Sequence, residues 1–107
     1  VVESYATTPG TPIAPIAAWD DFNDVIARAN ATEFGLAAYV FTENAALAAR
    51  TAEALEAGMV GINETLLATA EAPFGGIKQS GFGREGGSLG ILDYLTPKYT
   101  RHRLSLT

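Results

Sequence analysis

The spacing of apolar side chains predicts an amphipathic helix near the start of the chain. Apolar residues recur at the i, i+3, i+4 and i+7 positions of one helix face, at Phe22, Val25, Ile26 and Ala29. Asp20 is the expected N-cap, because a side-chain oxygen there can accept from the free N–H groups of the first turn. Asn30 is the expected end, since asparagine tolerates the left-handed backbone that closes a helix.

Continuous apolar runs predict two short strands, at residues 36–41 and 59–63. Their length and lack of alternation are typical of strands buried on both faces of a parallel sheet. A third apolar run, at residues 13–19, contains Pro15, which has no N–H to donate. That run therefore predicts a strand at a sheet edge or one with interrupted hydrogen bonding.

An alanine-rich segment between the two buried strands predicts a second helix. Thr42 or Asn44 is its expected N-cap, and the helix is expected to run through Ala57 and to stop at Gly58. The order strand, helix, strand, helix, strand predicts an α/β fold, with a parallel three-layer βαβαβ sheet and two crossovers.

The remaining segments show weaker patterns. Residues 1–10 have no period and predict a loose lead-in, whereas residues 64–87 form a long glycine-rich loop, a length that is usually functional. Ser88 is the expected cap of a short helix that runs to Leu95. Residues 99–106 alternate as a strand does, and such a terminal strand needs a partner for its backbone.

Composition narrows the function classes. Hydrophobic residues make up 48% of the 107 residues, which favours one folded domain with its own core. The net charge of −5 without a basic cluster argues against nucleic acid and anionic membranes as partners. No apolar run approaches the roughly twenty residues of a membrane-spanning helix. Because no signal-peptide pattern is present either, we expect a cytoplasmic protein.

The chain contains no cysteine, and its one histidine is His102. This count excludes disulfides, thiolate metal sites and a cysteine nucleophile within the chain. A Ser-His-Asp triad or a multi-histidine metal site has too few residues to form. We therefore expect no catalytic residue and no metal ligand in this chain.

A G-x-G-x-x-G pattern occurs at Gly81, Gly83 and Gly86. A dinucleotide fingerprint needs this loop to connect a strand directly to a helix, so that the pyrophosphate meets the helix N-terminus. The preceding predicted strand ends about twenty residues earlier, outside the range of such a unit. A chance match in a glycine-rich loop is the favoured interpretation, so no cofactor-binding residue is expected here.

Two other groups in this loop carry possible chemistry. Phe74 precedes two glycines, which allow a sharp bend that could hold the ring over a cavity. The alternative interpretation is a core phenylalanine beside a tight turn, and the physical properties of these residues by themselves favour this alternative. Arg84 and Glu85 are expected to form a salt-bridged turn in which the arginine caps backbone carbonyls. Lys78 and Lys98 are expected to be isolated cations.

Three motifs together resemble a known family. They are E-F-G-L-A-A-Y-V-F-T at 33–42, G-I-N at 61–63, and A-P-F-G-G-I-K-Q-S-G-F-G-R-E-G at 72–86. In order and spacing they resemble the C-terminal stretch of NAD(P)-dependent aldehyde dehydrogenases, over residues 12–106. Residues 90–95 with Lys98 and Tyr99 resemble the succinate-semialdehyde dehydrogenase branch.

This resemblance implies a division of the chain. Residues 1–11 would be a loose N-terminal segment, 12–97 the C-terminal part of the catalytic domain, and 98–107 an oligomerisation strand. In the family, the catalytic cysteine, the glutamate base and the nucleotide-binding domain lie upstream of the matched region. NAD or NADP is then the cofactor of the parent enzyme, and none is bound by this chain alone.

The resemblance also implies substrate-binding residues. Phe74 is similar to the aromatic residue that lines the substrate tunnel, and residues 64–71 to the wall of the aldehyde pocket. Ala68 stands where the semialdehyde branch has a serine that binds the distal carboxylate, and Thr69 beside it offers a hydroxyl. At residues 8–12 the chain reads T-P-G-T-P, where the family has E-x-F-G-P with a ribose-binding glutamate.

Two functions follow from these observations. The first is an aldehyde dehydrogenase fragment, inactive alone, whose partners are the rest of the parent enzyme and a second copy bound through the terminal strand. The alternative is a stand-alone interaction or oligomerisation module that reuses the fold. The altered residues 8–12 favour the module, and the intact signature at 73–85 favours the fragment.

Overall fold

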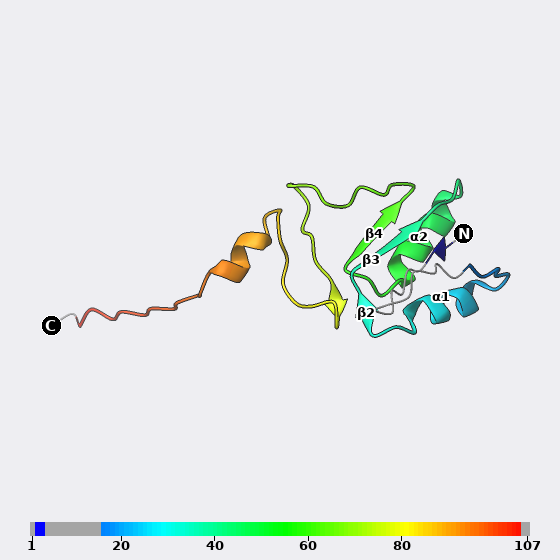
Figure 1. The fold of residues 1–107 in the computed structure, drawn as a ribbon. Helices are drawn as coiled ribbons and strands as arrows, with labels where there is room; N and C mark the ends of the chain where they lie inside the picture. The colour runs from blue at the N-terminus through cyan, green and yellow to red at the C-terminus, as the bar shows by residue number, and fades with distance from the viewer. Residues whose placement is uncertain (1, 4–15, 106–107) are drawn as a thin grey trace, which may run out of the picture.

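The computed structural model describes residues 2–3 and 16–105, which contain both helices and strands (Figure 1). The predicted first strand at 13–19 and the predicted last strand at 99–106 each lie partly outside this range. The described elements are β1 (Val2–Glu3), α1 (Phe22–Asn30), β2 (Phe34–Gly35), β3 (Ala37–Val40), α2 (Ala45–Ala54), β4 (Met59–Ile62), β5 (Ile77–Lys78) and the 3₁₀ helix η1 (Gly90–Tyr94).

The centre of the fold is a βαβ unit, as the apolar runs predicted. β3 and β4 pair in parallel from Ala37 opposite Met59 to Val40 opposite Ile62, and α2 connects them and contacts both. β1 pairs antiparallel with β3, so the sheet has the order β1-β3-β4. β2 and β5 form a separate antiparallel pair.

The prediction of a parallel βαβαβ sheet is wrong at its first strand. Residues 16–19 form no strand, and Ile16 is 88% exposed. Pro15 in this run has no N–H to donate, so the run is poorly suited to a sheet ladder. A strand that the lead-in was not expected to contain, β1, occupies the edge beside β3, and the sheet is therefore mixed.

Side-chain caps determine where the helices begin. Asp21, rather than Asp20, caps α1, because its Oδ1 accepts from the N–H of Asp24 at 2.7 Å. Asn44 caps α2 through a 3.0 Å bond from the N–H of Leu47, which decides between the two predicted caps.

α2 ends at Ala54, before the predicted Ala57. The side chain of Asn30 intervenes, since its Nδ2 donates to Ala54 O at 2.9 Å and its Oδ1 accepts from Glu56 N at 2.9 Å. These bonds satisfy Ala54 O and Glu56 N, which would otherwise need the hydrogen bonds of a further helical turn. Gly58 therefore does not stop the helix, and its role lies in packing.

The described core is small and lies where α1 and α2 meet β3. Its buried members are Val25, Val40, Ala48, Thr51 and Leu55. Thr51 is 2% exposed, and its hydroxyl donates to Leu47 O at 2.7 Å. The expected burial of both strand faces is not met, because Leu36 and Ile62 at the strand ends are each 42% exposed.

Beyond Gly87 the chain forms an arm, residues 88–105, that extends away from the sheet (Figure 1). Ser88 does not cap its helix, because η1 begins at Gly90 without a side-chain cap bond. Residues 96–105 are exposed and form no strand in the described chain, since a strand exists only where its backbone has a neighbour to pair with. The radius of gyration is accordingly 19.5 Å, against about 13 Å for a compact domain of this length.

Gly58 lies against the backbone of the glycine-rich loop, and we expect its replacement to destabilise the fold. A Cβ at this position would lie 2.7 Å from Gly76 Cα, and backbone atoms cannot rotate away as a side chain can. We expect Gly58→Ala to lower the free energy of unfolding by about 1–3 kcal/mol in urea denaturation. Ala49→Ser, at an exposed site on α2, should change it by less than about 0.5 kcal/mol. Equal stability of Gly58→Ala and the unmodified chain would contradict this packing.

Candidate active-site groove

The 73–85 signature folds into a loop whose two ends are bonded together. Phe74 and Glu85 face each other as an isolated antiparallel bridge, with two N–H···O bonds of 2.7 Å. A groove of about 330 Å³ opens beside this bridge and reaches the first turn of the arm. Its lining includes Phe74, Ser80, Phe82, Arg84, Asp93 and Tyr94.

Arg84 organises the wall of this groove. Its Nη1 donates to Gly76 O at 2.8 Å and to Gly83 O at 2.7 Å, which confirms the prediction that it caps backbone carbonyls. Its backbone N–H donates to Asp93 Oδ2 at 2.7 Å and so holds the start of the arm. The expected salt bridge to Glu85 is wrong, because the ion pairs of the described residues involve other side chains.

The glycines of the G-x-G-x-x-G pattern serve turns. Gly81, Gly83 and Gly86 have φ values of 110°, 83° and 68°, which disfavour residues with a Cβ. β5 ends at Lys78, and the next helical element is the short 3₁₀ helix η1 rather than an α-helix. Residues 77–94 therefore do not form the strand-to-helix turn that a dinucleotide fingerprint requires.

The residues implied for substrate binding lie in two separate places. Phe74 is partly buried and lines the groove, as expected of an aromatic residue held over a cavity. Ala68 and Thr69 are exposed on the loop between β4 and β5, and neither lines this groove. That loop returns to the signature through Gly87, whose N–H donates to Ala70 O at 3.0 Å. The described chain alone does not bring Phe74 together with Ala68 and Thr69.

Polar side chains order the start of the β4–β5 loop. Asn63 has a left-handed backbone with φ of 52°, and its side chain bonds both backbone groups of Thr42, at 2.8 and 2.9 Å. Glu64 Oε1 accepts from the N–H groups of Thr65 at 2.7 Å and Leu66 at 2.8 Å. These bonds, that from Leu66 first, lower the pKa of Glu64 because they favour the ionised carboxylate.

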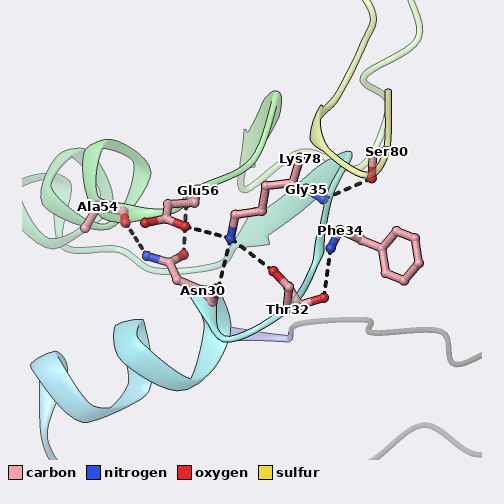
Figure 2. Close-up of polar contacts among 8 residues, drawn as sticks. All are labelled: Asn30, Thr32, Phe34, Gly35, Ala54, Glu56, Lys78 and Ser80. Carbon is pink, nitrogen blue, oxygen red and sulfur yellow. Dashed lines mark hydrogen bonds and ion pairs between the residues drawn. The ribbon is translucent and has the colours of Figure 1, made fainter. Parts of the chain in front are cut away.

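Lys78 is a site residue that sequence reasoning missed. Figure 2 shows its ammonium among three oxygens of two segments: Glu56 Oε2 at 2.6 Å after α2, and Asn30 O at 2.9 Å and Thr32 O at 3.2 Å at the end of α1 and just beyond it. The prediction of an isolated cation is therefore wrong. No local pattern could have found this cluster, since its partners lie far from Lys78 in the sequence and two of them are backbone carbonyls.

Residues 2–3 and 16–105 contain no group of three or more His, Cys, Asp or Glu side chains placed to hold a metal ion. Within the same ranges, no helix has the length and apolarity needed to cross a membrane.

Comparison with known proteins identifies the family. Residues 7–100 match the model of the aldehyde dehydrogenase family. The chain belongs to this family. It is 54% identical over 88 residues to succinate-semialdehyde dehydrogenase (NADP(+)) of Escherichia coli strain K12, and 51% identical to the mitochondrial succinate-semialdehyde dehydrogenase of Mus musculus. Each match covers 82% of this chain but only 18% and 17% of the relative.

Solved structures of the family share the fold. An aldehyde dehydrogenase from Brucella melitensis biovar abortus 2308 aligns with a TM-score of 0.75 and 58% identity, over 79% of this chain and 18% of that one. The NAD+ complex of aldehyde dehydrogenase from Bacillus cereus aligns with a TM-score of 0.69 and 49% identity, over 71% and 16%. The chain thus spans about a fifth or less of the length of these relatives.

The hydrogen bonds to Glu64 predict a pH-dependent turn. Because the folded-state pKa is lowered, the stabilisation is present above the ordinary pKa of glutamate and is lost as the pH falls through the lowered value. In an NMR titration, the amide protons of Thr65 and Leu66 should shift with a midpoint below that of glutamate in an unstructured peptide. Glu64→Gln should abolish this titration, and a midpoint above the peptide value would contradict the assignment.

Proposed function

We propose that this chain is the C-terminal part of an aldehyde dehydrogenase catalytic domain, where it supplies one wall of the aldehyde pocket and contacts between subunits. The supporting observation is the 54% identity to a succinate-semialdehyde dehydrogenase, spread over 82% of this chain but only 18% of that relative. Identity at this level over most of the chain favours a shared role for the segment.

The chemistry of the chain supports a contributing role rather than activity alone. Aldehyde oxidation through a thioester needs a thiolate nucleophile, and this sequence contains no cysteine. The nucleophile, the base and the binding site for NAD or NADP would come from the rest of the parent enzyme. One relative is solved as an NAD+ complex.

The groove supports a role at the aldehyde pocket. Phe74 gives an apolar surface against which the carbon chain of an aldehyde can pack, and its backbone is held by the bridge to Glu85. In this proposal Ala68 and Thr69 belong to the same wall in the assembled enzyme, where the Thr69 hydroxyl could donate to a distal carboxylate. The substrate class is then a semialdehyde, with the serine contact of that branch replaced.

Transplanting the segment into an active relative tests this proposal. The 88 matched residues of the E. coli enzyme would be replaced by those of this chain. We expect the chimera to reduce NADP with succinate semialdehyde, whereas the host without the segment and this chain alone should show no activity. Phe74→Ala in the chimera should lower kcat/KM at least about tenfold, because an aromatic contact of about 1.4 kcal/mol or more is lost.

The result that would overturn the proposal is also measurable. A chimera that sediments as the host does and binds nucleotide, yet oxidises no aldehyde, would favour the stand-alone interaction module. The cytoplasmic location stays a prediction, since the relatives include mitochondrial and bacterial enzymes.

We also propose that the arm mediates self-association. Tyr94 is 83% exposed, and Tyr99 and Leu104 on the extended segment are similarly exposed. An unpaired extended backbone with apolar side chains favours pairing with a second copy, although Arg101 and Arg103 oppose uncontrolled stacking.

Sedimentation of the chain tests this association. At micromolar concentration we expect a dimer or a larger oligomer, because pairing of the 98–107 segments buries apolar side chains and satisfies backbone groups. Deleting residues 98–107 should yield a monomer or an unfolded chain. A full-length chain that sediments as a clean monomer would disprove the role of the arm.

A further inference from the structure

Lys78 adopts a backbone conformation that lysine alone does not favour. Its φ is 56°, in the left-handed region where a Cβ is crowded by the neighbouring carbonyl. Such a conformation persists in a non-glycine residue only where surrounding contacts hold it. The Lys78 side chain makes contacts of this kind.

The ammonium of Lys78 occupies a cage of oxygens. It lies 2.6 Å from Glu56 Oε2, 2.9 Å from Asn30 O and 3.2 Å from Thr32 O, so its three N–H donors have three acceptors (Figure 2). The Lys78 side chain is 24% exposed, whereas that of Glu56 is 57% exposed, so the cage is closed on the side of the backbone carbonyls and open to water at the carboxylate. The Asn30 side chain braces the cage, since its bonds to Ala54 O and Glu56 N join the ends of α1 and α2.

The segment between Lys78 and the groove has little freedom to move. Ile77 pairs with Gly35, and Ser80 Oγ accepts from Gly35 N at 2.9 Å. Gly76 is buried, and a Cβ there would lie 2.6 Å from Ser80 Cβ. A displacement at Lys78 would therefore be transmitted along closely packed backbone to Phe74.

We propose that Lys78 is a positioning residue, whose ammonium acts as a tethered cation that fixes the 74–78 segment and thereby the Phe74 wall of the groove. The cage is observed directly in the contacts of the described residues. Its consequence for the reaction rests on the proposed function, because that function places Phe74 at the aldehyde pocket.

The backbone of Lys78 allows a variant that separates the cage from the strain. Lys78→Gly removes the side chain but suits a φ of 56°, so backbone strain is relieved rather than added. The variant leaves a space that matches the four methylenes and the ammonium of the lost side chain. The three acceptor oxygens remain at its end. Butylammonium has this shape and charge, and butanol serves as its uncharged control.

Amide hydrogen exchange on the 107-residue chain gives the primary test. In Lys78→Gly, the amides of Phe74 and Glu85 should exchange at least about tenfold faster, while those of 37–40 in β3 keep their protection. Butylammonium should restore the protection of Phe74 and Glu85 in a saturable manner, and butanol should not. Lys98→Gly, a lysine on the exposed arm, is the matched control and should leave both amides unchanged.

The outcomes separate the possible roles. Unchanged exchange at Phe74 and Glu85 would overturn the proposal, as would equal loss of protection in β3, because Lys78 would then hold the whole fold rather than the loop. Rescue by butanol as well as butylammonium would also overturn it, since filling the cavity rather than charge would suffice.

Kinetics of the chimera test the consequence for the reaction. Lys78→Gly should raise the KM for aldehyde at least about fivefold while the KM for NADP is unchanged, and butylammonium should reverse the effect. If exchange responds as expected but the aldehyde KM does not, the cage stands and the placement of Phe74 in the aldehyde pocket is wrong.

Discussion

The close contact between Gly58 and the backbone of Gly75 and Gly76 is the constraint on which the rest of the structure depends. It joins the βαβ unit to the signature loop at a distance that no side chain could fit. From Gly58 the chain enters β4, and from Gly76 it enters β5, so one contact sets the position of both strands. The position of the groove follows from that of the sheet because the signature loop packs directly against the backbone at the start of β4.

Polar side chains bonded to backbone groups then order the segments that lack regular structure. Arg84 holds the carbonyls of the signature loop, Asn63 holds the chain as it leaves β4, and Lys78 joins the ends of the two helices. Buried backbone groups in loops require such partners, since no strand or helix is present to satisfy them. The shape of the groove and of the loops around it therefore depends on polar side chains that hydrogen-bond to backbone groups of the same chain.

Apolar surface is distributed unevenly between the two ends of the molecule. The sheet and helices bury a small core, whereas the arm exposes Tyr94, Tyr99 and Leu104. Surface of this kind is stable in water when another surface covers it. This exposed apolar surface is the surface that the proposed self-association of the arm would cover.

The sequence by itself determined the helices, the parallel β3–β4 pair and the family, because these depend on local periodicity, caps and motifs that neighbouring residues carry. Tertiary structure alone decided the pairing of β1 with β3 and of β2 with β5, the exposure of the strand ends, and the cage around Lys78. The Lys78 ammonium donates to the carbonyl of Asn30, which lies 48 positions away in the sequence, and two of its three partners are backbone carbonyls. A carbonyl is present at every residue and leaves no mark in the sequence, so only the folded chain shows which ones meet.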